Sequence, residues 1–178
     1  MDNTKTALRI GAIYAPQESR TSTEDYEKMY ENLSKQILIA KQKDQKVLMM
    51  GDLNCKVGDR IEGNTTEISK SGKNLLQLIK SNRLKILNET EKCEGLWIRM
   101  DGKSKSVLDY LITDRTDEPA LTSMLIDEEG EYAPKRQEVN NESTSDHNMI
   151  IARFNWMIDN ETPKEAKKMV ITKRDIAE

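Results

Sequence analysis

The chain has 178 residues, a length that suits one domain and leaves little room for a second. Charged residues make up 33% and the formal net charge is −3, so the average charge does not favour non-specific nucleic-acid binding, which needs a positive face. No run of about 18 apolar residues exists and the first six residues are mostly polar, which argues against a membrane span and a signal peptide. We therefore expect a nuclear or cytoplasmic protein without membrane contact.

The first fifty residues predict a strand, a helix and a second strand. Residues 7–14 form a short β-prone run that Pro16 ends. Ser22 and Asp25 have the spacing of a capping box. The helix after them has one apolar face, made of Tyr26, Met29, Tyr30, Leu33, Ile37 and Ala40. Residues 46–50 then have the composition of a buried strand, so this segment indicates a parallel crossover.

The remainder of the chain alternates short apolar runs with polar stretches. These runs predict a helix at 74–81 and strands at 84–87, 96–100, 106–113, 121–126 and 148–154. The turn dipeptide Asp101-Gly102 is expected to join two of these strands into an antiparallel hairpin. Strands outnumber helices and both pairing senses occur, so we expect an α/β or α+β fold with a sheet covered by helices. The two cysteines are too few for a disulfide framework and are expected to be reduced structural thiols.

Three polar clusters are candidates for chemistry. Asp52 and Asn54 follow the strand at 46–50, where α/β folds place ligands, although Asp and Asn after glycine are also ordinary turn residues. Asp109 lies in an apolar strand, so it either needs a partner such as an imidazole or faces solvent. Asp146 and the only histidine, His147, precede the last strand. A lone histidine is more often structural than catalytic, but the order of the three clusters favours a shared site.

Four motifs, read together, resemble those of a known superfamily. They are Ile13-Tyr14-Ala15-Pro16, Gly51-Asp52-Leu53-Asn54, Ser106-x-Leu108-Asp109-Tyr110 and Ser145-Asp146-His147. Their order is similar to that in the endonuclease/exonuclease/phosphatase superfamily, and most similar to the apurinic-type endonuclease domains of non-LTR (LINE-type) retrotransposons. The resemblance spans about residues 8–154 and only the later part of the family domain. It implies the C-terminal half of a two-sheet αββα sandwich of the deoxyribonuclease type, with its first half missing.

The resemblance also implies domain boundaries and an activity. Residues 1–156 would be a partial endonuclease/exonuclease/phosphatase domain, and 157–178 a polar linker or a short tail helix. The activity would be hydrolysis of DNA phosphodiester bonds with Mg²⁺, or with Mn²⁺ in its place. The implied partners are DNA and a reverse-transcriptase region in a longer chain.

Each motif residue has a role by the same resemblance. Tyr14 would contact the scissile phosphate, while Asp52 and Asn54 would position the attacking water and stabilise the transition state. Asp109 would orient the imidazole of His147 beside the phosphate. These roles fit general chemistry, because phosphodiester cleavage needs an activated water, charge neutralisation and a protonated leaving oxygen.

The expected metal site is incomplete in this sequence. Asp146 would help to hold the ion, with Asp52 and Asn54 as further ligands. The family's early Asn and its metal-binding Glu both precede the tyrosine motif, and the thirteen residues before Tyr14 supply neither. Because Mg²⁺ is held by one or two carboxylates plus substrate oxygens, we expect low Mg²⁺ affinity and weak or absent activity from this chain alone. An uncovered sheet face, through which the chain would self-associate, is also expected.

Two other functions fit the sequence. The first is hydrolysis of a different phosphoester, such as a phosphoinositide or a nucleotide, by the same kind of site. The second is a non-catalytic nucleic-acid-binding or interaction fragment. Binding of Mg²⁺ or Mn²⁺ that depends on Asp52 would separate the enzyme from the non-catalytic fragment.

Overall fold

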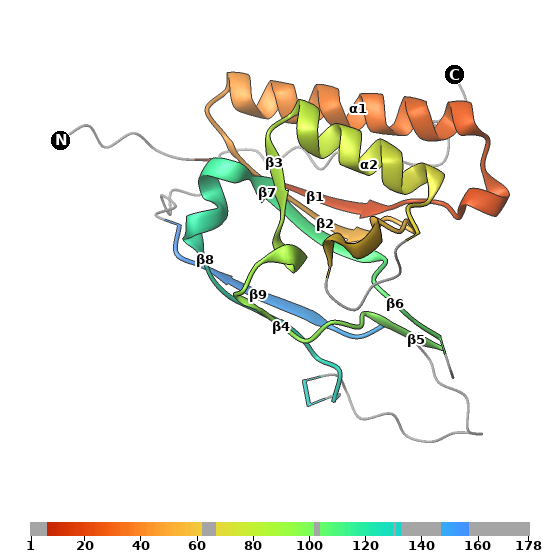
Figure 1. The fold of residues 1–178 in the computed structure, drawn as a ribbon. Helices are drawn as coiled ribbons and strands as arrows, with labels where there is room; N and C mark the ends of the chain where they lie inside the picture. Colours follow the sequence, from red (N-terminus) through yellow and green to blue (C-terminus); the bar gives the residue numbers. More distant parts are fainter. Residues whose placement is uncertain (1–6, 62–66, 102–103, 130, 133–146, 157–178) are drawn as a thin grey trace.

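The computed structural model describes residues 7–61, 67–101, 104–129, 131–132 and 147–156. Within these residues the chain forms three layers, with two helices on one side, a four-stranded sheet in the middle and a three-stranded sheet on the other side (Figure 1). This mixed α/β architecture with two sheets is the one that the sequence predicts. The second helical layer of an αββα sandwich has no counterpart among the described residues.

The central sheet has the strand order β1-β2-β7-β3. Its strands are β1 (Leu8–Tyr14), β2 (Lys46–Asp52), β7 (Asp109–Asp114) and β3 (Leu84–Ile86). Helix α1 (Thr23–Gln42) connects β1 to the parallel strand β2, which confirms the predicted crossover. β7 pairs antiparallel with both β2 and β3. Four consecutive residues of β7 are buried, the pattern of a strand that is covered on both faces.

Both helices begin at serine caps. Ser22 Oγ accepts a hydrogen bond from the Asp25 backbone N–H at 3.1 Å, and the predicted apolar face of α1 is buried at Tyr26, Tyr30, Ile37 and Ala40. Helix α2 (Lys70–Ser81) starts earlier than the predicted residue 74 because Ser69 caps it, accepting from the Gly72 N–H at 3.0 Å. Short 3-10 turns precede the two helices, η1 (Glu18–Arg20) and η2 (Gly58–Arg60).

The second sheet has the order β4-β8-β9. It consists of β4 (Cys93–Glu94), β8 (Leu121–Ile126) and β9 (Ile150–Phe154). The turn η3 (Leu87–Glu89) leads from β3 toward β4, and η4 (Arg115–Ala120) leads from β7 to β8. β8 runs parallel to β4 and antiparallel to β9.

The predicted hairpin between 96–100 and 106–113 is wrong in its extent. A short hairpin does form around the expected turn, between β5 (Arg99–Asp101) and β6 (Ser104–Ser106). The rest of the second predicted strand is β7, which leaves the hairpin and joins the central sheet. Pairing between β2 and β3 buries the apolar side chains of β7, which stabilises it more than an isolated two-stranded ribbon would.

One face of β1 is not covered by the second sheet. The parallel register pairs Ile10 with Leu48 and Ala12 with Met50, so these side chains share the face opposite the helices. Ile10 is 59% exposed, and a cavity of about 540 Å³ lies between β2, β7 and β9. Its apolar lining is Leu48, Met50, Leu111, Ile150, Ile151, Ala152 and Phe154. Both β1 and β9 are edge strands, so the gap between the sheets opens along this side of the molecule.

Three further predictions concern the cysteines, the tail and the membrane. Cys55 and Cys93 are both free thiols, and burial raises the pKa of Cys55 to about 12, as suits a structural residue. The predicted tail segment 157–178 lies outside the described residues. In the part of the chain that the structure describes, neither helix is both long and apolar enough to cross a membrane.

Candidate active site

Three adjacent strands of the central sheet place polar side chains in one row. Tyr14, the last residue of β1, is in register with Asp52, the last residue of β2. Asp52 is in turn in register with Asp109, the first residue of the antiparallel strand β7. Paired residues of neighbouring strands point to the same face, so these three side chains lie together on the face toward the second sheet. Tyr14 is 78% exposed there.

His147 joins this row from the other sheet. It lies three residues before β9, and its Nδ1 atom is 2.7 Å from Oδ2 of Asp109. An ionised carboxylate only accepts hydrogen bonds, so Nδ1 is the atom that carries the proton, and Nε2 is the proton acceptor of the neutral ring. The site therefore sits at the rim where the two sheets meet. The structure brings together Tyr14, Asp52, Asn54, Asp109 and His147, and their catalytic roles stay predictions.

Two buried side chains fix the strand that carries Asp109. Asn88 donates through Nδ2 to the Asp109 carbonyl at 3.2 Å and accepts through Oδ1 from the Leu111 N–H at 3.0 Å. The hydroxyl of Tyr110 donates toward the carbonyls of Cys55, at 2.7 Å, and Val107, at 3.0 Å. Burial raises the pKa of Tyr110 well above its usual range, so the hydroxyl keeps its proton. These contacts tie the start of β7 to the loop after β2.

The loop after β2 has a backbone that few residues can adopt. Gly51 has φ +131°, and a Cβ there would lie 2.0 Å from the Ile13 carbonyl oxygen, so only glycine fits. Asn54 has φ +45°, a left-handed conformation that asparagine tolerates. Its N–H donates to Asp52 Oδ1 at 2.8 Å, and its Nδ2 donates to the Ala15 carbonyl at 2.7 Å and to Asp52 Oδ2 at 3.1 Å. Asn54 thus orients the Asp52 carboxylate and joins the loops after β1 and β2.

The loop after Tyr14 is held by residues that no motif singled out. The hydroxyl of Tyr26 donates to the Pro16 carbonyl, and Glu18 Oε1 accepts from Ser71 Oγ at 2.6 Å and from the Ser71 N–H in the first turn of α2. Burial alone would raise the pKa of Glu18, but these hydrogen bonds outweigh it and lower the pKa below its usual value. Glu18 therefore stays ionised at the positive end of the helix.

The neighbour of His147 is a further anchor. Asn148 donates through Nδ2 to the Trp97 carbonyl at 2.7 Å, and its backbone N–H donates to the Ile98 carbonyl. These two bonds fasten the segment before β9 to the chain that enters β5. Sequence reasoning missed Asn148, Asn88 and Glu18. Only the hydrogen bonds in the folded structure show that such polar residues hold a site in place. The one available signal was the position of Asn148 directly after the only histidine.

The expected metal ligands are only partly placed. Asp146 lies outside the described residues. Among the residues that the structure does describe, no three His, Cys, Asp or Glu side chains gather into a metal-binding group. Asp52 supplies a carboxylate at the row of site residues, and Asn54 supplies an amide Oδ1 beside it, since its amide nitrogen is engaged. Oxygen ligands of this kind suit Mg²⁺, but one carboxylate is a small ligand set.

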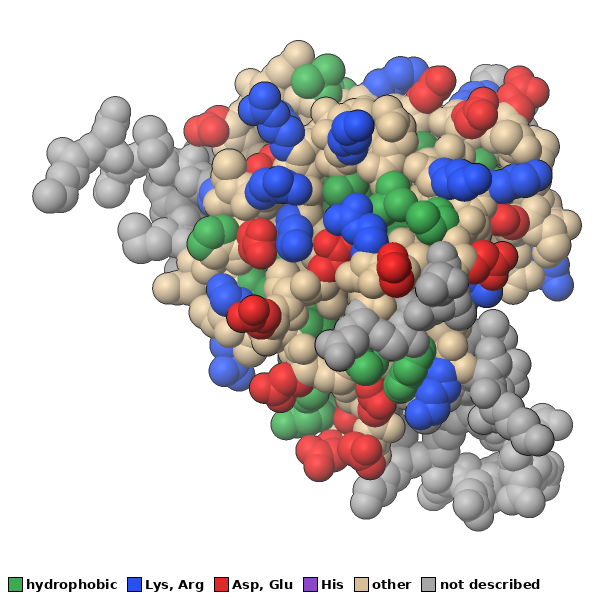
Figure 2. Space-filling model, viewed as in Figure 1, with side chains coloured by type: hydrophobic (Ala, Val, Ile, Leu, Met, Phe, Trp, Pro, Cys, Tyr) green, Lys and Arg blue, Asp and Glu red, His purple; other side chains and the backbone are tan. Residues whose placement is uncertain are grey.

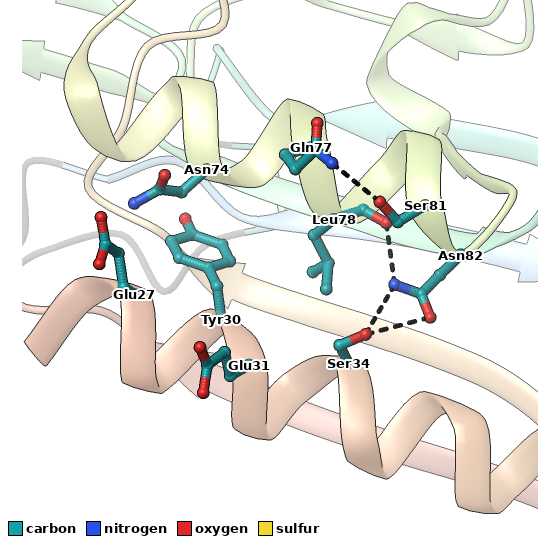
Figure 3. A pocket seen from close by; sticks show the side chains of 9 residues that line it. All are labelled: Glu27, Tyr30, Glu31, Ser34, Asn74, Gln77, Leu78, Ser81 and Asn82. Atoms are coloured by element: carbon teal, nitrogen blue, oxygen red, sulfur yellow. Dashed lines mark hydrogen bonds between the residues drawn. The ribbon is translucent and has the colours of Figure 1, made fainter. Parts of the chain in front are cut away.

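A separate pocket of about 260 Å³ lies between α1 and α2, behind the central sheet. Figure 3 shows that its lining is mostly amides, hydroxyls and two glutamates, from Glu27 and Glu31 on α1 to Asn74 and Gln77 on α2. Asn82 Nδ2 bridges the helices by donating to Ser34 Oγ at 3.1 Å. No candidate site residue lines this pocket, so it belongs to the packing of the two helices.

Comparison with known families decides where the chain belongs. The family model described as "Endonuclease-reverse transcriptase" matches residues 8–151. The chain belongs to this family. The match includes all four motifs, and it confirms the resemblance to endonuclease/exonuclease/phosphatase nuclease domains that the sequence predicted. A search of curated protein sequences finds no match.

Solved structures at low sequence identity share the fold of this chain. The 3′ phosphatase NExo from Neisseria, bound to product DNA hairpin, has a TM-score of 0.62 and 18% identity. The 3′-5′ exonuclease NExo from Neisseria meningitidis has a TM-score of 0.61 and 18% identity. Each comparison covers 84% of this chain and 62% of the neighbour, so the chain spans less than two thirds of their length. The endonuclease domain of TRAS1, a telomere-specific non-LTR retrotransposon, has a TM-score of 0.48 and 20% identity, over 71% of this chain and 52% of that one.

Proposed function

We propose that this site hydrolyses phosphodiester bonds in DNA. The observation that carries the proposal is the 2.7 Å contact between His147 Nδ1 and Asp109 Oδ2, at the strand end that also presents Asp52 and Tyr14. An imidazole held by a carboxylate is suited to transfer a proton to or from a phosphate oxygen. DNA is supported as the polymer by the neighbour NExo, which is described as bound to a DNA hairpin.

The chain's own residues would divide the chemistry between them. Asp109 would keep His147 in the tautomer that has its proton on Nδ1, and Nε2 would be the atom that exchanges a proton with the phosphate. The Asp52 carboxylate would orient the attacking water and accept its proton, while Asn54 holds that carboxylate in place. The exposed hydroxyl of Tyr14 would donate to a phosphoryl oxygen.

Mg²⁺, or Mn²⁺ in its place, is the cofactor that we propose. Asp52 and Asn54 Oδ1 would hold it, and Asp146 would add a second carboxylate. When bound, the ion would neutralise charge on the phosphoryl oxygens. Because the described residues offer so few ligands, most of the coordination would have to come from water and substrate oxygens, so binding should be weak without DNA.

Weak or absent cleavage by the chain alone is part of the proposal. The site lies at the rim of an apolar gap, and the second sheet does not extend over β1, which carries Tyr14. A phosphate bound there would be held from one side and exposed to water, which weakens the interactions that stabilise the transition state. Further polypeptide, such as a longer chain that also contains a reverse-transcriptase region, would close the site.

Nicking of supercoiled plasmid and cleavage of an abasic duplex, both with Mg²⁺, test this function. We expect slow turnover that His147→Ala removes and that Lys28→Ala, at an exposed position on α1, leaves unchanged. Fast turnover that depends on His147 would contradict the proposed weakness while supporting the site. Turnover that persists in His147→Ala would overturn the site assignment.

A non-catalytic interaction fragment is the second candidate function, and the open apolar gap is the observation in its favour. Among the residues that the structure describes, β1 and β9 each have one edge without a partner strand, next to apolar side chains. Self-association of the chain through these edges follows from this candidate and is tested below. The described residues contain no feature that favours a phosphoester other than DNA.

A further inference from the structure

A groove on the outer flank of the molecule is lined by cations. Its volume is about 590 Å³, and it lies between α2, the start of β3 and the turn η4. We call it the basic groove, and its lining is Arg60, Leu76, Ile79, Lys80, Arg83, Asp114, Arg115 and Thr116. On the face in view in Figure 2, Lys and Arg side chains, with Asp and Glu side chains between them, lie over β3 and the adjoining part of α2 around a small apolar area. The groove contains no residue of the candidate active site.

Backbone hydrogen bonds hold three of these cations together. The Arg83 N–H donates to the Lys80 carbonyl at 3.4 Å, and the Arg115 N–H donates to the Arg83 carbonyl at 3.0 Å. Arg83 has φ +53°, the left-handed turn that ends α2 and starts β3. Three exposed cations from two distant parts of the sequence are therefore fixed side by side at one end of the central sheet.

The positive charge of this groove is not cancelled locally. Its one carboxylate, Asp114, is already engaged, because Oδ2 pairs with Lys41 and Oδ1 accepts from Thr116. Arg60 is paired with Glu89, at 2.8 Å from Nε to Oε1. Lys80, Arg83 and Arg115 form no ion pair with any residue that the structure describes. Like charges this close repel one another, and a bound polyanion would relieve the repulsion.

The groove lies away from the site that would cut DNA. Asp109 begins β7 at the active-site end, and Arg115 directly follows its other end. Asp114 lies five steps along the strand from Asp109, at about 3.3 Å each, so the two ends are roughly 17 Å apart. A phosphate at the candidate active site therefore cannot contact Arg115 as well. Whatever anion the groove binds is a different segment of polymer from the one at His147.

We propose that the basic groove binds the phosphodiester backbone of a nucleic acid, at a distance from the cleaved bond. Two arginines whose backbones are joined suit phosphate oxygens, which guanidinium groups bind through paired N–H donors. No aromatic side chain lines the groove, so bases have no stacking platform and recognition is of the backbone, without sequence preference. The apolar floor of Leu76 and Ile79 is suited to contact with sugars. The identity of the polymer rests on the proposed nuclease function.

Fluorescence anisotropy of the full chain, without divalent ions, tests this proposal at several salt concentrations. The test variant is Lys80→Gln/Arg83→Gln/Arg115→Gln, and the matched control is Lys28→Gln/Lys35→Gln/Lys43→Gln, which removes the same charge from exposed positions on α1 and at its end. For duplex DNA, loss of three phosphate contacts should reduce the slope of log affinity against log salt by about 2.7, and for single-stranded RNA by about 2. The control should leave the slope almost unchanged.

The two nucleic acids in this experiment distinguish binding to a DNA backbone from binding to an RNA backbone. A slope loss near the expected value for duplex DNA with almost none for single-stranded RNA assigns the groove to DNA, and the expected loss for RNA with almost none for DNA assigns it to RNA; either supports the proposal. An equal loss in the test and control variants, or no loss in either, overturns it. Polyglutamate that competes as well as nucleic acid also overturns it, in favour of an acidic protein. Anisotropy measures binding and does not depend on cleavage. If the chain binds nucleic acid through the groove but never cuts DNA, the proposed nuclease function is refuted while the proposed role of the groove stands.

Discussion

Asn88 supports the candidate site although it contacts no expected substrate. It is 7% exposed, and its side chain replaces the missing strand partner where β3 has ended, bonding to the backbone of both Asp109 and Leu111. The loop residue Asn54 acts on the side chain of Asp52 itself, because its backbone N–H and its Nδ2 donate to the two carboxylate oxygens. At this scale the geometry of the carboxylates is set by neutral amides, which hold the backbone without adding a charge that would compete for the imidazole.

Replacement of Asn88 by alanine is expected to destabilise the fold and loosen the site. Two backbone groups of β7 would lose their partners at about 1–3 kcal/mol each, so the free energy of unfolding should fall by about 2–6 kcal/mol. Urea denaturation followed by circular dichroism measures this. Asn32→Ala, at an exposed position on α1, should change the same quantity by less than about 0.5 kcal/mol. Equal stability of the two variants would contradict the role given to Asn88.

The residues of the candidate site could be predicted from sequence, while those that position them could not. Tyr14, Asp52, Asp109 and His147 are recognisable because each belongs to a short motif in or beside a predicted strand. Asn88 and Glu18 carry no such mark, since their partners are backbone groups or side chains 21 to 53 positions away. Tertiary hydrogen bonds of this kind are decided by the fold and have no local pattern.

At the scale of elements, local patterns predicted the strands and helices better than their pairing. The β1–α1–β2 unit was predicted because an apolar helical stripe lies between two apolar runs. β7 was predicted as a strand but given the wrong partner, because the nearest strand in sequence competes with β2 and β3, which are distant in sequence. The start of α2 was missed because its first turn is polar and its cap, Ser69, looks like part of a loop.

The end of β7 is joined to α1 by a pair whose strength depends on pH. Asp114 pairs with Lys41 and accepts from Thr116. Burial alone would raise the pKa of Asp114, but the bonds from Lys41 and Thr116 outweigh it and lower the pKa below its ordinary value. A carboxyl group whose pKa is lower in the folded state than in the unfolded state stabilises the fold at pH values above its pKa in the unfolded state. This contribution is lost as the pH falls through its pKa in the folded state.

Acid titration of stability tests the Asp114 pair. The difference in free energy of unfolding between the wild type and Asp114→Asn should be constant near neutral pH and should shrink below about pH 4. Asp25→Asn, in the first turn of α1, provides a comparison outside this pair. A difference that grows on acidification would show that the carboxylate is not stabilised in the fold.

On the scale of the whole molecule, the gap between the two sheets is the main region where apolar side chains lack a packing partner among the described residues. Helices cover one face of the central sheet, but the opposite face of β1 exposes Ile10 and Tyr14, and β9 exposes Ile151 at 38%. Apolar side chains beside two strand edges that no described strand pairs with favour addition of further strands. This arrangement connects the proposed weak activity with the proposed self-association, since both follow from one uncovered side.

Sedimentation velocity at several concentrations tests self-association through these edges. We expect the wild type to form species larger than a monomer, and Ile10→Lys to return it to a monomer because a charge on the β1 edge opposes strand addition. Leu38→Lys changes a residue of similar exposure, 54%, on α1 and should not alter the distribution. A wild type that stays monomeric at every concentration would contradict this expectation.

Nuclear magnetic resonance of the imidazole tests the central contact most directly, because His147 is the only histidine and its signals are unambiguous. In a chain labelled with ¹⁵N-histidine, we predict a downfield proton bound to Nδ1 that is protected from exchange by the bond to Asp109. Asp109→Ala should remove that signal, and Asp59→Ala, at an exposed position in η2, should preserve it. A wild-type spectrum without the Nδ1 proton, or one that Asp109→Ala leaves unchanged, would contradict the account of this site.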